Sequence, residues 1–443
     1  MYVFDYALKA YRDRSLNNFG SPAPLVPFKL PFGFDVAITT IYNLHTHNFF
    51  ELLVGWLNAV PGRTVELRMF GNGLIISDEP AIIKGIMSTE YSSFGRGKVT
   101  NGIWGNMLGD GQIFITDGDI WHKAKDSLNP HASDALYNEL DFRLIAAPAG
   151  YVQTPSCRAA ADVLNKINTA RQLFMELALW IPDTMLAPKA LKDLTAWTTG
   201  VTDRAYARDL SQKKPENYTM LDDFVTQKKS YKEIKEMLFS IMLGGKDPSS
   251  ILITWAIFEM GKDPCVMKKM KKEVSDVCGT KLPTAADLRN MPYLRHVINE
   301  TFRLHHPLGV NVRTTLKNVT LPVGGGESGK EPLAISKGTT IVYSLMSMQR
   351  RKDIYGEDAD IFRPERWEEM TPSRWHFIPY NHGPRSCIGR NFGQQQVEYI
   401  LARICQEYEE ILIPPQREQQ IRVELNVKMA HPCLCEFVKN EKF

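Results

Sequence analysis

The sequence predicts a mainly α fold that also contains small β-sheets (α+β). Helical patterns dominate from Trp121 onward, and the longest runs from about Tyr231 to Met260. Strand-like alternation is found in residues 64–77 and 312–345. Of the 443 residues, 44% are hydrophobic and 23% are charged, which is typical of a globular protein. We therefore expect a helix-rich body and a small β-rich lobe drawn from both ends of the chain.

The first elements are expected to be extended. Residues 21–33 carry four prolines, so residues 1–33 are interpreted as a stiff, proline-rich lead-in. Two alternating apolar runs, 64–70 and 74–77, flank Gly71-Asn72-Gly73 and predict a β-hairpin.

Three further helices are expected. Asp78 and Pro80 provide a cap and a first-turn proline for one of them. The others cover about 285–305 and about 388–408. Within the longest helical pattern, the two glycines and the proline of residues 243–250 predict a local break.

Two motif-like stretches are interpreted as structural. His431, Cys433, Cys435 and Phe437 alternate, which favours one face of a late strand over a zinc site. Residues 324–330 fit a phosphate-binding loop, but Glu331 and Pro332 follow where a Ser or Thr and a helix should stand. We therefore expect a surface loop between two strands.

Composition excludes some classes of protein. The formal net charge is only +3, so we expect no nucleic-acid partner. Seven cysteines without regular spacing argue against a disulfide framework and suit a reducing compartment. No stretch approaches the roughly 18 apolar residues that span a bilayer, and residues 1–5 do not resemble a signal peptide. We therefore expect no membrane anchor in this chain.

The segment 377–393 contains a cysteine suited to binding a metal. Cys387 precedes a helical pattern, whose first amides favour the thiolate. Gly383 and Gly389 allow a tight turn and the close approach of a flat cofactor, and Arg385 adds charge suited to a haem propionate. A structural cysteine beside an ordinary turn is the alternative.

The segment Gly383-Pro-Arg-Ser-Cys-Ile-Gly389 resembles the signature of the cytochrome P-450 family, the haem-thiolate monooxygenases. Tyr380 stands where the family usually has phenylalanine. The resemblance implies a cytochrome P-450 fold, with residues 1–443 forming a single haem-binding monooxygenase domain. It also implies that Cys387 is the axial ligand of the iron of haem b (iron protoporphyrin IX).

A second motif consists of Glu300 and Arg303, three residues apart on a helix. Alone, this spacing is typical of a surface ion pair. However, the downstream segment 362–367, Phe-Arg-Pro-Glu-Arg-Trp, resembles the family's partner segment. The resemblance implies that Glu300, Arg303 and Arg366 form a buried structural triad.

The expected break in the longest helix resembles the family's oxygen-binding motif. Asp247 and Ser249 match that motif, and Pro248 replaces its first threonine. The resemblance assigns a catalytic proton relay to Asp247 and Ser249; a loop between two helices is the alternative.

Charged residues elsewhere match the family's haem propionate contacts. Trp121 and Lys125 resemble its Trp-x-x-x-Arg pattern, and Arg313 matches another such contact. Solvated surface charges are the alternative for Lys125 and Arg313.

Residues 93–97, 109–118 and 321–338 resemble the fungal branch that includes alkane and fatty-acid hydroxylases. The resemblance runs from about 22 to 128 and from 231 to the end. The region of about 130–230 matches poorly and is shorter than the corresponding region in that branch. Either the natural protein is divergent or truncated, or a gene model lost coding segments.

The expected function is insertion of one oxygen atom from O₂, the co-substrate, into a lipophilic molecule. That substrate is a fatty acid or alkane, or a fungal secondary metabolite, and mostly apolar residues are expected around it: Trp104, Met107, Met242, Leu243 and 308–310. Electrons are expected to come from NADPH through a separate NADPH-cytochrome P-450 reductase. Basic surface for such a partner is expected from lysines 268, 269, 271 and 272 with Lys123 and Lys125, and solvated faces are the alternative. The resemblance implies a location at the endoplasmic reticulum surface, and the chain is compatible with association with that membrane. A cytoplasmic location is the alternative. A catalytically impaired haem-binding relic, or the product of an incorrect gene model, is the alternative function.

Overall fold

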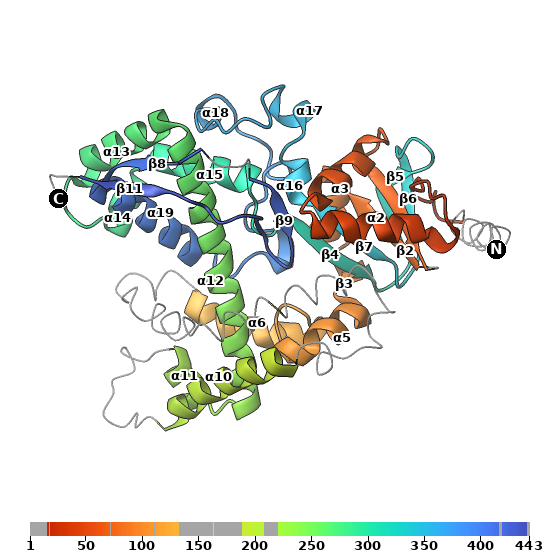
Figure 1. Ribbon diagram of the computed structural model, residues 1–443. Helices are drawn as coiled ribbons and strands as arrows, with labels where there is room; N and C mark the ends of the chain where they lie inside the picture. The colour runs from red at the N-terminus through yellow and green to blue at the C-terminus, as the bar shows by residue number, and fades with distance from the viewer. Residues whose placement is uncertain are drawn as a thin grey trace. The chain divides into compact units, whose positions relative to one another are not determined.

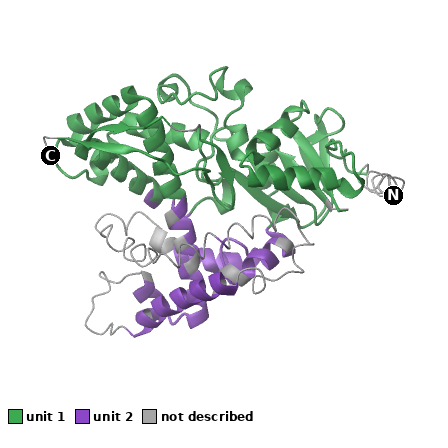
Figure 2. Ribbon diagram, in the orientation of Figure 1, with its two compact units in different colours: residues 1–95, 248–387, 393–443 green, residues 96–247, 388–392 purple. Residues whose placement is uncertain are grey.

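The computed structural model describes residues 16, 18–70, 72–109, 111–132, 163, 188–207, 220–415 and 419–440 (Figure 1). Helices predominate and the sheets are small, so the predicted fold class is confirmed. The chain divides into two compact units (Figure 2). Unit 1 comprises residues 1–95, 248–387 and 393–443, and unit 2 comprises residues 96–247 and 388–392. The expectation of one haem-binding domain over 1–443 stays a prediction.

The largest sheet belongs to unit 1. The predicted hairpin is confirmed: β1 (Thr64–Met69) and β2 (Asn72–Ser77) pair antiparallel, with Thr64 opposite Ser77. β2 is parallel to β7 (Thr340–Ser344), β7 is antiparallel to β4 (Val310–Thr315), and β3 (Phe94–Gly95) pairs with β4. Helices α2 (Phe34–His45) and α3 (Phe49–Asn58) pack against β1 (Figure 1).

The proline-rich lead-in is extended from Gly20 to Phe28, as predicted, because the proline rings hold the backbone out of a helix. It is anchored by isolated β-bridges from Ser21 to Leu333 and from Leu25 to Glu66. A short 3-10 turn, η1 (Pro31–Gly33), follows.

The glycine-rich stretch is a loop between two strands, as predicted. β5 (Val319–Gly325) and β6 (Glu331–Ile335) form an antiparallel hairpin around it. Because Pro332 lies in a strand and not at the start of a helix, the N–H groups that a phosphate-binding loop needs are not presented here.

The predicted capping role of Asp78 is wrong. Helix α4 (Pro80–Lys84) begins at the expected proline, but its N-cap is Glu79, and no side chain caps it. The buried Asp78 carboxylate instead accepts hydrogen bonds from Arg63 Nε, at 2.8 Å, and from the Ser347 hydroxyl, at 2.6 Å.

Unit 1 also contains three further turns: a π-helical turn, η2 (Gly85–Thr89), and two 3-10 turns, η3 (Tyr91–Ser93) and η7 (Gly383–Arg385).

The helical part of unit 1 has its own apolar core. The helix expected over 285–305 is two helices, because Pro292 begins a second one. The Glu273 carboxylate caps that second helix, accepting from the backbone N–H groups of Tyr293 and Leu294 at 2.8 Å. The helices that follow α12 are α13 (Pro264–Cys278), α14 (Ala285–Arg289), α15 (Pro292–Leu304), α16 (Leu345–Met348), α17 (Lys352–Tyr355), α18 (Arg366–Glu369) and α19 (Arg390–Glu407). The core includes Leu252, Met270, Leu294, Val297, Leu401 and Ala402.

Two small antiparallel sheets lie near the C-terminal end of unit 1. They are β8 (Tyr408–Leu412) with β11 (Glu436–Lys439), and β9 (Ile421–Val423) with β10 (Val427–Met429). The expected late strand from His431 to Phe437 is therefore only partly correct. Of its four residues, Phe437 alone lies in a strand, because the backbone bends at residues 430 and 431 and strand pairing begins only at Glu436.

Unit 2 is helical in the part that the structure describes. It contains α5 (Gly97–Leu108), α6 (Gly118–Ala132), α10 (Pro188–Tyr206), α11 (Met220–Thr226) and the first part of α12 (Tyr231–Lys262). Its core includes Leu128, Val201, Phe224, Ile234 and Leu238.

The predicted break in α12 is wrong. The helix runs without interruption from Tyr231 to Lys262, with Pro248 inside it. Proline lacks one N–H and therefore removes the hydrogen bond to the carbonyl of Gly244, four residues earlier. The bonds on either side suffice to continue the helix.

Among the described residues, no helix is both long and apolar enough to cross a membrane.

Candidate functional site

Cys387 ends a loop that is closed by a backbone hydrogen bond. Its N–H donates to the carbonyl of Tyr380 at 2.8 Å. The residue is exposed, and α19 begins three residues later, at Arg390. The loop therefore presents the sulfur at its surface, shortly before a helix N-terminus, which favours the ionised thiol.

Gly383 is the position in this loop where only glycine fits. Its φ is +69°, and a Cβ atom built there would lie 1.9 Å from the carbonyl oxygen of Met87. Gly389 differs, because no atom of the described residues lies within 4 Å of a Cβ built there. The first glycine therefore seats the loop on η2, and the described residues place no such restriction on the second.

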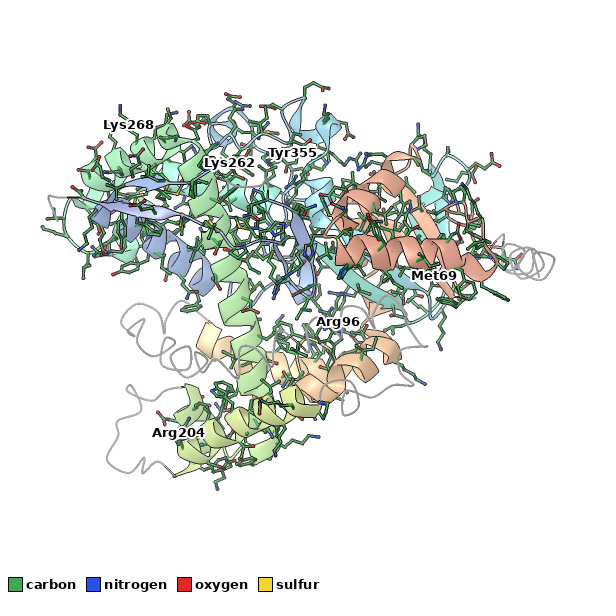
Figure 3. The ribbon with its side chains drawn as sticks, viewed as in Figure 1. Met69, Arg96, Arg204, Lys262, Lys268 and Tyr355 are labelled. Atoms are coloured by element: carbon green, nitrogen blue, oxygen red, sulfur yellow. The ribbon has the colours of Figure 1, made fainter. Side chains whose placement is uncertain are left out.

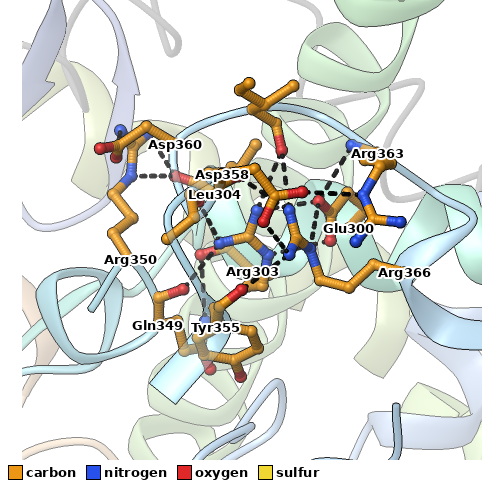
Figure 4. Close-up of polar contacts among 12 residues, drawn as sticks. Glu300, Arg303, Leu304, Gln349, Arg350, Tyr355, Asp358, Asp360, Arg363 and Arg366 are labelled. Carbon is orange, nitrogen blue, oxygen red and sulfur yellow. Dashed lines mark hydrogen bonds and ion pairs between the residues drawn. The ribbon is translucent and has the colours of Figure 1, made fainter. Parts of the chain in front are cut away.

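Glu300, Arg303 and Arg366 lie together in the interior of unit 1 (Figure 4). Arg303 donates to both oxygens of Glu300, at 2.8 and 2.9 Å, and Arg366 Nε lies 3.3 Å from Glu300 Oε1. The relative exposure of the three residues is 0, 0 and 1%. The spacing of three residues on α15 thus makes a buried pair, not a surface one.

Further donors complete the Glu300 site. The backbone N–H of Arg363 and the indole N–H of Trp367 donate to its carboxylate at 3.0 and 3.1 Å. Asp358 accepts from Arg366 Nη1 at 2.8 Å and from Arg363 Nε at 2.9 Å (Figure 4). Asp358 could not be recognised from the sequence, because no local pattern distinguishes an acid that meets its partners only in the folded chain.

Arg303 also ties α15 to the chain that follows β7. Its guanidinium donates to the carbonyl oxygens of Gln349, Ala359 and Ile361, at 2.9, 2.6 and 3.3 Å. The ring of Tyr355 lies under it, with 5.0 Å from the guanidinium carbon to the ring centroid. Every N–H group of the buried Arg303 guanidinium is thus directed at an acceptor, so none of its donors is left unsatisfied.

The two arginines expected at the haem are placed differently. Arg385 Nε donates to the hydroxyl of Tyr91 at 3.3 Å. Arg313 lies on β4, is 7% exposed, and donates to the carbonyl of its neighbour Val312 at 2.8 Å. Among the described residues, no carboxylate pairs with Arg313. A buried guanidinium with one neutral partner is costly, so this position suits an anionic ligand group.

Trp121 and Lys125 lie on one face of α6. Trp121 is buried, and the Lys125 ammonium lies 5.1 Å from the centroid of its ring. A spacing of four residues on a helix brings these side chains together.

Asp247 and Ser249 both lie on α12, on either side of Pro248, with Asp247 in unit 2 and Ser249 in unit 1. The Ser249 hydroxyl lies 3.8 Å from a Cβ built on Gly393 of α19, the helix that follows Cys387. The relay role of both residues stays a prediction.

Two buried histidines at the end of α15 were also missed. His305 Nε2 lies 2.8 Å from Glu259 Oε1, and its ring stacks on Trp255 with centroids 3.7 Å apart. Burial lowers the pKa of His305 to about 4, against the opposing effect of Glu259. His306 Nε2 lies 3.0 Å from the carbonyl oxygen of Ile378, and burial lowers its pKa to about 4 as well. The sequence signal was the pair of histidines directly after the Glu300–Arg303 motif.

Of the residues expected around the substrate, Trp104 and Leu243 are buried in unit 2. The side chains of Met107 and Met242 lie outside the described part of the structure. Leu308 and Val310, in unit 1, are half-buried. Their role toward a substrate stays a prediction.

Known proteins resemble this chain over most of its length. The family model "Cytochrome P450" matches residues 160–432, including part of the interval 130–230 in which the sequence showed little resemblance. "Cytochrome P450 monooxygenase pvhE" of Talaromyces variabilis is 26% identical over 473 residues, which cover 92% of this chain and 88% of that protein. "Cytochrome P450 52A1" of Candida tropicalis is 28% identical over 415 residues, covering 80% and 76%. "Cytochrome P450 monooxygenase alt2" of Alternaria solani is 25% identical over 461 residues, covering 88% and 86%. The chain therefore belongs to the cytochrome P450 family of haem-thiolate monooxygenases.

Proposed function

We propose that Cys387 holds the iron of haem b in this chain. The observation that carries this assignment is the loop from Tyr380 to Cys387, which exposes the sulfur shortly before α19. The Cys387 thiolate would donate electron density to the iron. When bound, the haem supplies the activation of dioxygen that monooxygenation requires.

The residues present fit this group. Arg313 is a buried cation whose only partner among the described residues is a neutral carbonyl, and a propionate would supply the missing anion. A Cβ atom on Gly389 would meet no atom of the described residues within 4 Å, and glycine at this position permits the close approach of a flat ring. We assign the remaining propionate contacts to Arg385, Trp121 and Lys125.

Asp247 and Ser249 are proposed to hold and pass on the protons that the oxygen chemistry of the haem would consume. Pro248 has no side-chain hydroxyl, so the alcohol of the relay is assigned to Ser249.

The electrons are proposed to come from NADPH through a separate reductase, and the substrate is proposed to be lipophilic. The lysines of α13 offer less basic surface than their number suggests. Lys269 pairs with Glu365 at 2.5 Å, Lys272 pairs with Asp276 at 2.7 Å, and Lys271 pairs with Glu409. Lys268, labelled in Figure 3, is exposed, and no acid pairs with it among the described residues.

The substrate class and the place of action complete the proposal. The substrate is a fatty acid or alkane, or a fungal secondary metabolite. Product analysis with a purified reductase and one representative of each class distinguishes the two. We place the enzyme at the endoplasmic reticulum surface, and cell fractionation separates this from a cytoplasmic location.

The optical spectrum of the reduced, carbon monoxide-bound full chain tests the proposal. A Soret band of thiolate type that is lost in Cys387→Ala is expected. A histidine-type band would show that another atom binds the iron, and a protein without a haem band would contradict the proposal altogether. Turnover with a reductase then separates an active enzyme from a haem-binding relic.

A further inference from the structure

His306 makes two hydrogen bonds that together define its tautomer. The backbone N–H of Leu308 donates to His306 Nδ1 at 3.0 Å. A ring nitrogen accepts a hydrogen bond only when it carries no proton itself, so the proton of the neutral His306 ring lies on Nε2. Nε2 therefore donates to the carbonyl oxygen of Ile378 at 3.0 Å. His306 is 3% exposed, and its neutral form is the one that fits this interior.

Ile378 is held at its other end by a second buried side chain. Its N–H donates to Gln349 Oε1 at 2.9 Å. The amide nitrogen of Gln349 in turn donates to the carbonyl oxygens of Phe302 and Arg303, at 3.2 and 3.3 Å. Both polar groups of the Ile378 backbone are thus tied by side chains to the last turn of α15.

This clamp lies two residues from the closure of the cysteine loop. The carbonyl of Tyr380 accepts the N–H of Cys387 at 2.8 Å. The Tyr380 ring packs edge-on against Phe302 with centroids 5.0 Å apart, and the Phe302 ring packs against His306 at 5.8 Å. The end of α15 therefore contacts the segment 378–380 through hydrogen bonds and aromatic packing.

We propose that His306 is a positioning residue for Cys387, acting through its hydrogen bond to the Ile378 carbonyl. The inference rests on the proposed function, because the position of the Cys387 sulfur matters only if this sulfur binds the haem iron. Without its donor, the buried carbonyl of Ile378 would lack a partner, and the segment would move to find one. A shift of Tyr380 would carry Cys387 with it, because the two backbones are bonded. Ligand geometry tolerates displacements of only about 0.5 Å.

The alternative is that His306 only supports the end of α15 through the N–H of Leu308. Two substitutions separate the roles. In His306→Gln, the amide nitrogen reaches the place of Nε2 and retains the donor to Ile378. In His306→Asn, the amide oxygen takes the place of Nδ1 and retains the acceptor for Leu308, but no donor reaches Ile378.

The full-length variants are compared with the wild type by hydrogen exchange of the Cys387 amide and by the spectrum of the reduced, carbon monoxide-bound form. In His306→Asn we expect exchange at Cys387 to accelerate about tenfold, as local opening predicts, and the thiolate-type band to be partly lost. In His306→Gln, both should stay within about twofold of the wild type. Thermal unfolding is the control, because each variant loses one hydrogen bond.

Wild-type exchange and spectrum in His306→Asn would overturn the inference, as would equal damage in both variants. If the wild type lacks a thiolate-type band, the proposed function fails. The exchange of the Cys387 amide then still decides whether His306 positions the loop, because that measurement needs no haem.

Discussion

The carboxylate of Glu300 and the guanidinium of Arg303 are paired through two hydrogen bonds, of 2.8 and 2.9 Å, and neither residue is exposed to solvent. The same carboxylate also accepts from Arg366. Removing its charge would leave two buried cations without this partner, which is costly because the interior cannot replace the lost anion with water.

We therefore expect Glu300→Gln to lower the free energy of unfolding by about 3–5 kcal/mol. Denaturant unfolding of the full chain measures this. The matched control is Glu357→Gln, because Glu357 pairs with Lys352 at 3.0 Å in an exposed position. That control should change stability by less than about 1 kcal/mol. Equal effects of the two substitutions would contradict the structural role of Glu300.

The two glycines of the cysteine loop should respond oppositely to alanine. Gly383→Ala meets the Met87 carbonyl and requires a left-handed backbone, so it should destabilise the chain by at least about 2 kcal/mol. Gly389→Ala meets no atom of the part of the chain that the structure describes within 4 Å, so it should leave the stability of the haem-free chain unchanged. Its effect should appear in haem titration, as weaker binding. If Gly389→Ala binds haem like the wild type, the cofactor does not approach Gly389 closely.

The buried Arg313 gives a test that does not depend on turnover. Arg313→Met removes a charge that has no anionic partner among the described residues, so the haem-free chain should be as stable as the wild type or more stable. Haem affinity should fall about tenfold, which corresponds to one lost charge-assisted hydrogen bond. Arg313→Lys keeps the charge and should retain more of that affinity. A haem titration in which Arg313→Met binds as tightly as the wild type would remove Arg313 from the propionate contacts.

Stability should fall as the pH decreases from 7 toward 4. In the folded chain, the pKa values of His305 and His306 are both about 4, below the ordinary value of about 6.5 that applies to the unfolded chain. The unfolded chain therefore takes up protons first, and each histidine destabilises the fold by about 2 kcal/mol between pH 7 and pH 5.

Unfolding experiments at several pH values measure this dependence. His305→Gln should make the pH dependence shallower, since Gln does not titrate. The control His45→Gln changes an exposed histidine of α2 and should leave the dependence as in the wild type. A dependence that is the same in all three proteins would show that other groups titrate in this range.

The assignment of the relay alcohol predicts a change in the fate of electrons. Ser249→Ala should increase the fraction of NADPH that ends in peroxide or water instead of product, because proton delivery is less well directed. Assays of NADPH consumption and peroxide release with a reductase measure this. Ser250→Ala, at the exposed neighbouring serine, is the matched control. Normal coupling in Ser249→Ala would show that the assignment is wrong.

Local patterns predicted most elements correctly. The hairpin at 64–77 and the strands within 310–344 follow from alternation and turn residues, which act between neighbours in the sequence. Two predictions failed for different reasons, one long-range and one local. Asp78 does not cap α4, because its carboxylate accepts hydrogen bonds from Arg63 and Ser347 instead. Pro248 does not break α12, because the helical hydrogen bonds around it persist.

The sequence by itself determined the family, because the Cys387 loop and the Glu300–Arg303 helix keep their residues at short, ordered spacings. Only the tertiary structure decided that Asp358 completes the Glu300 network, that Arg313 is a buried cation beside a neutral carbonyl, and that His306 reaches Ile378. The physical reason is that these relations depend on burial and on contacts between separate segments, and a linear pattern does not encode either one.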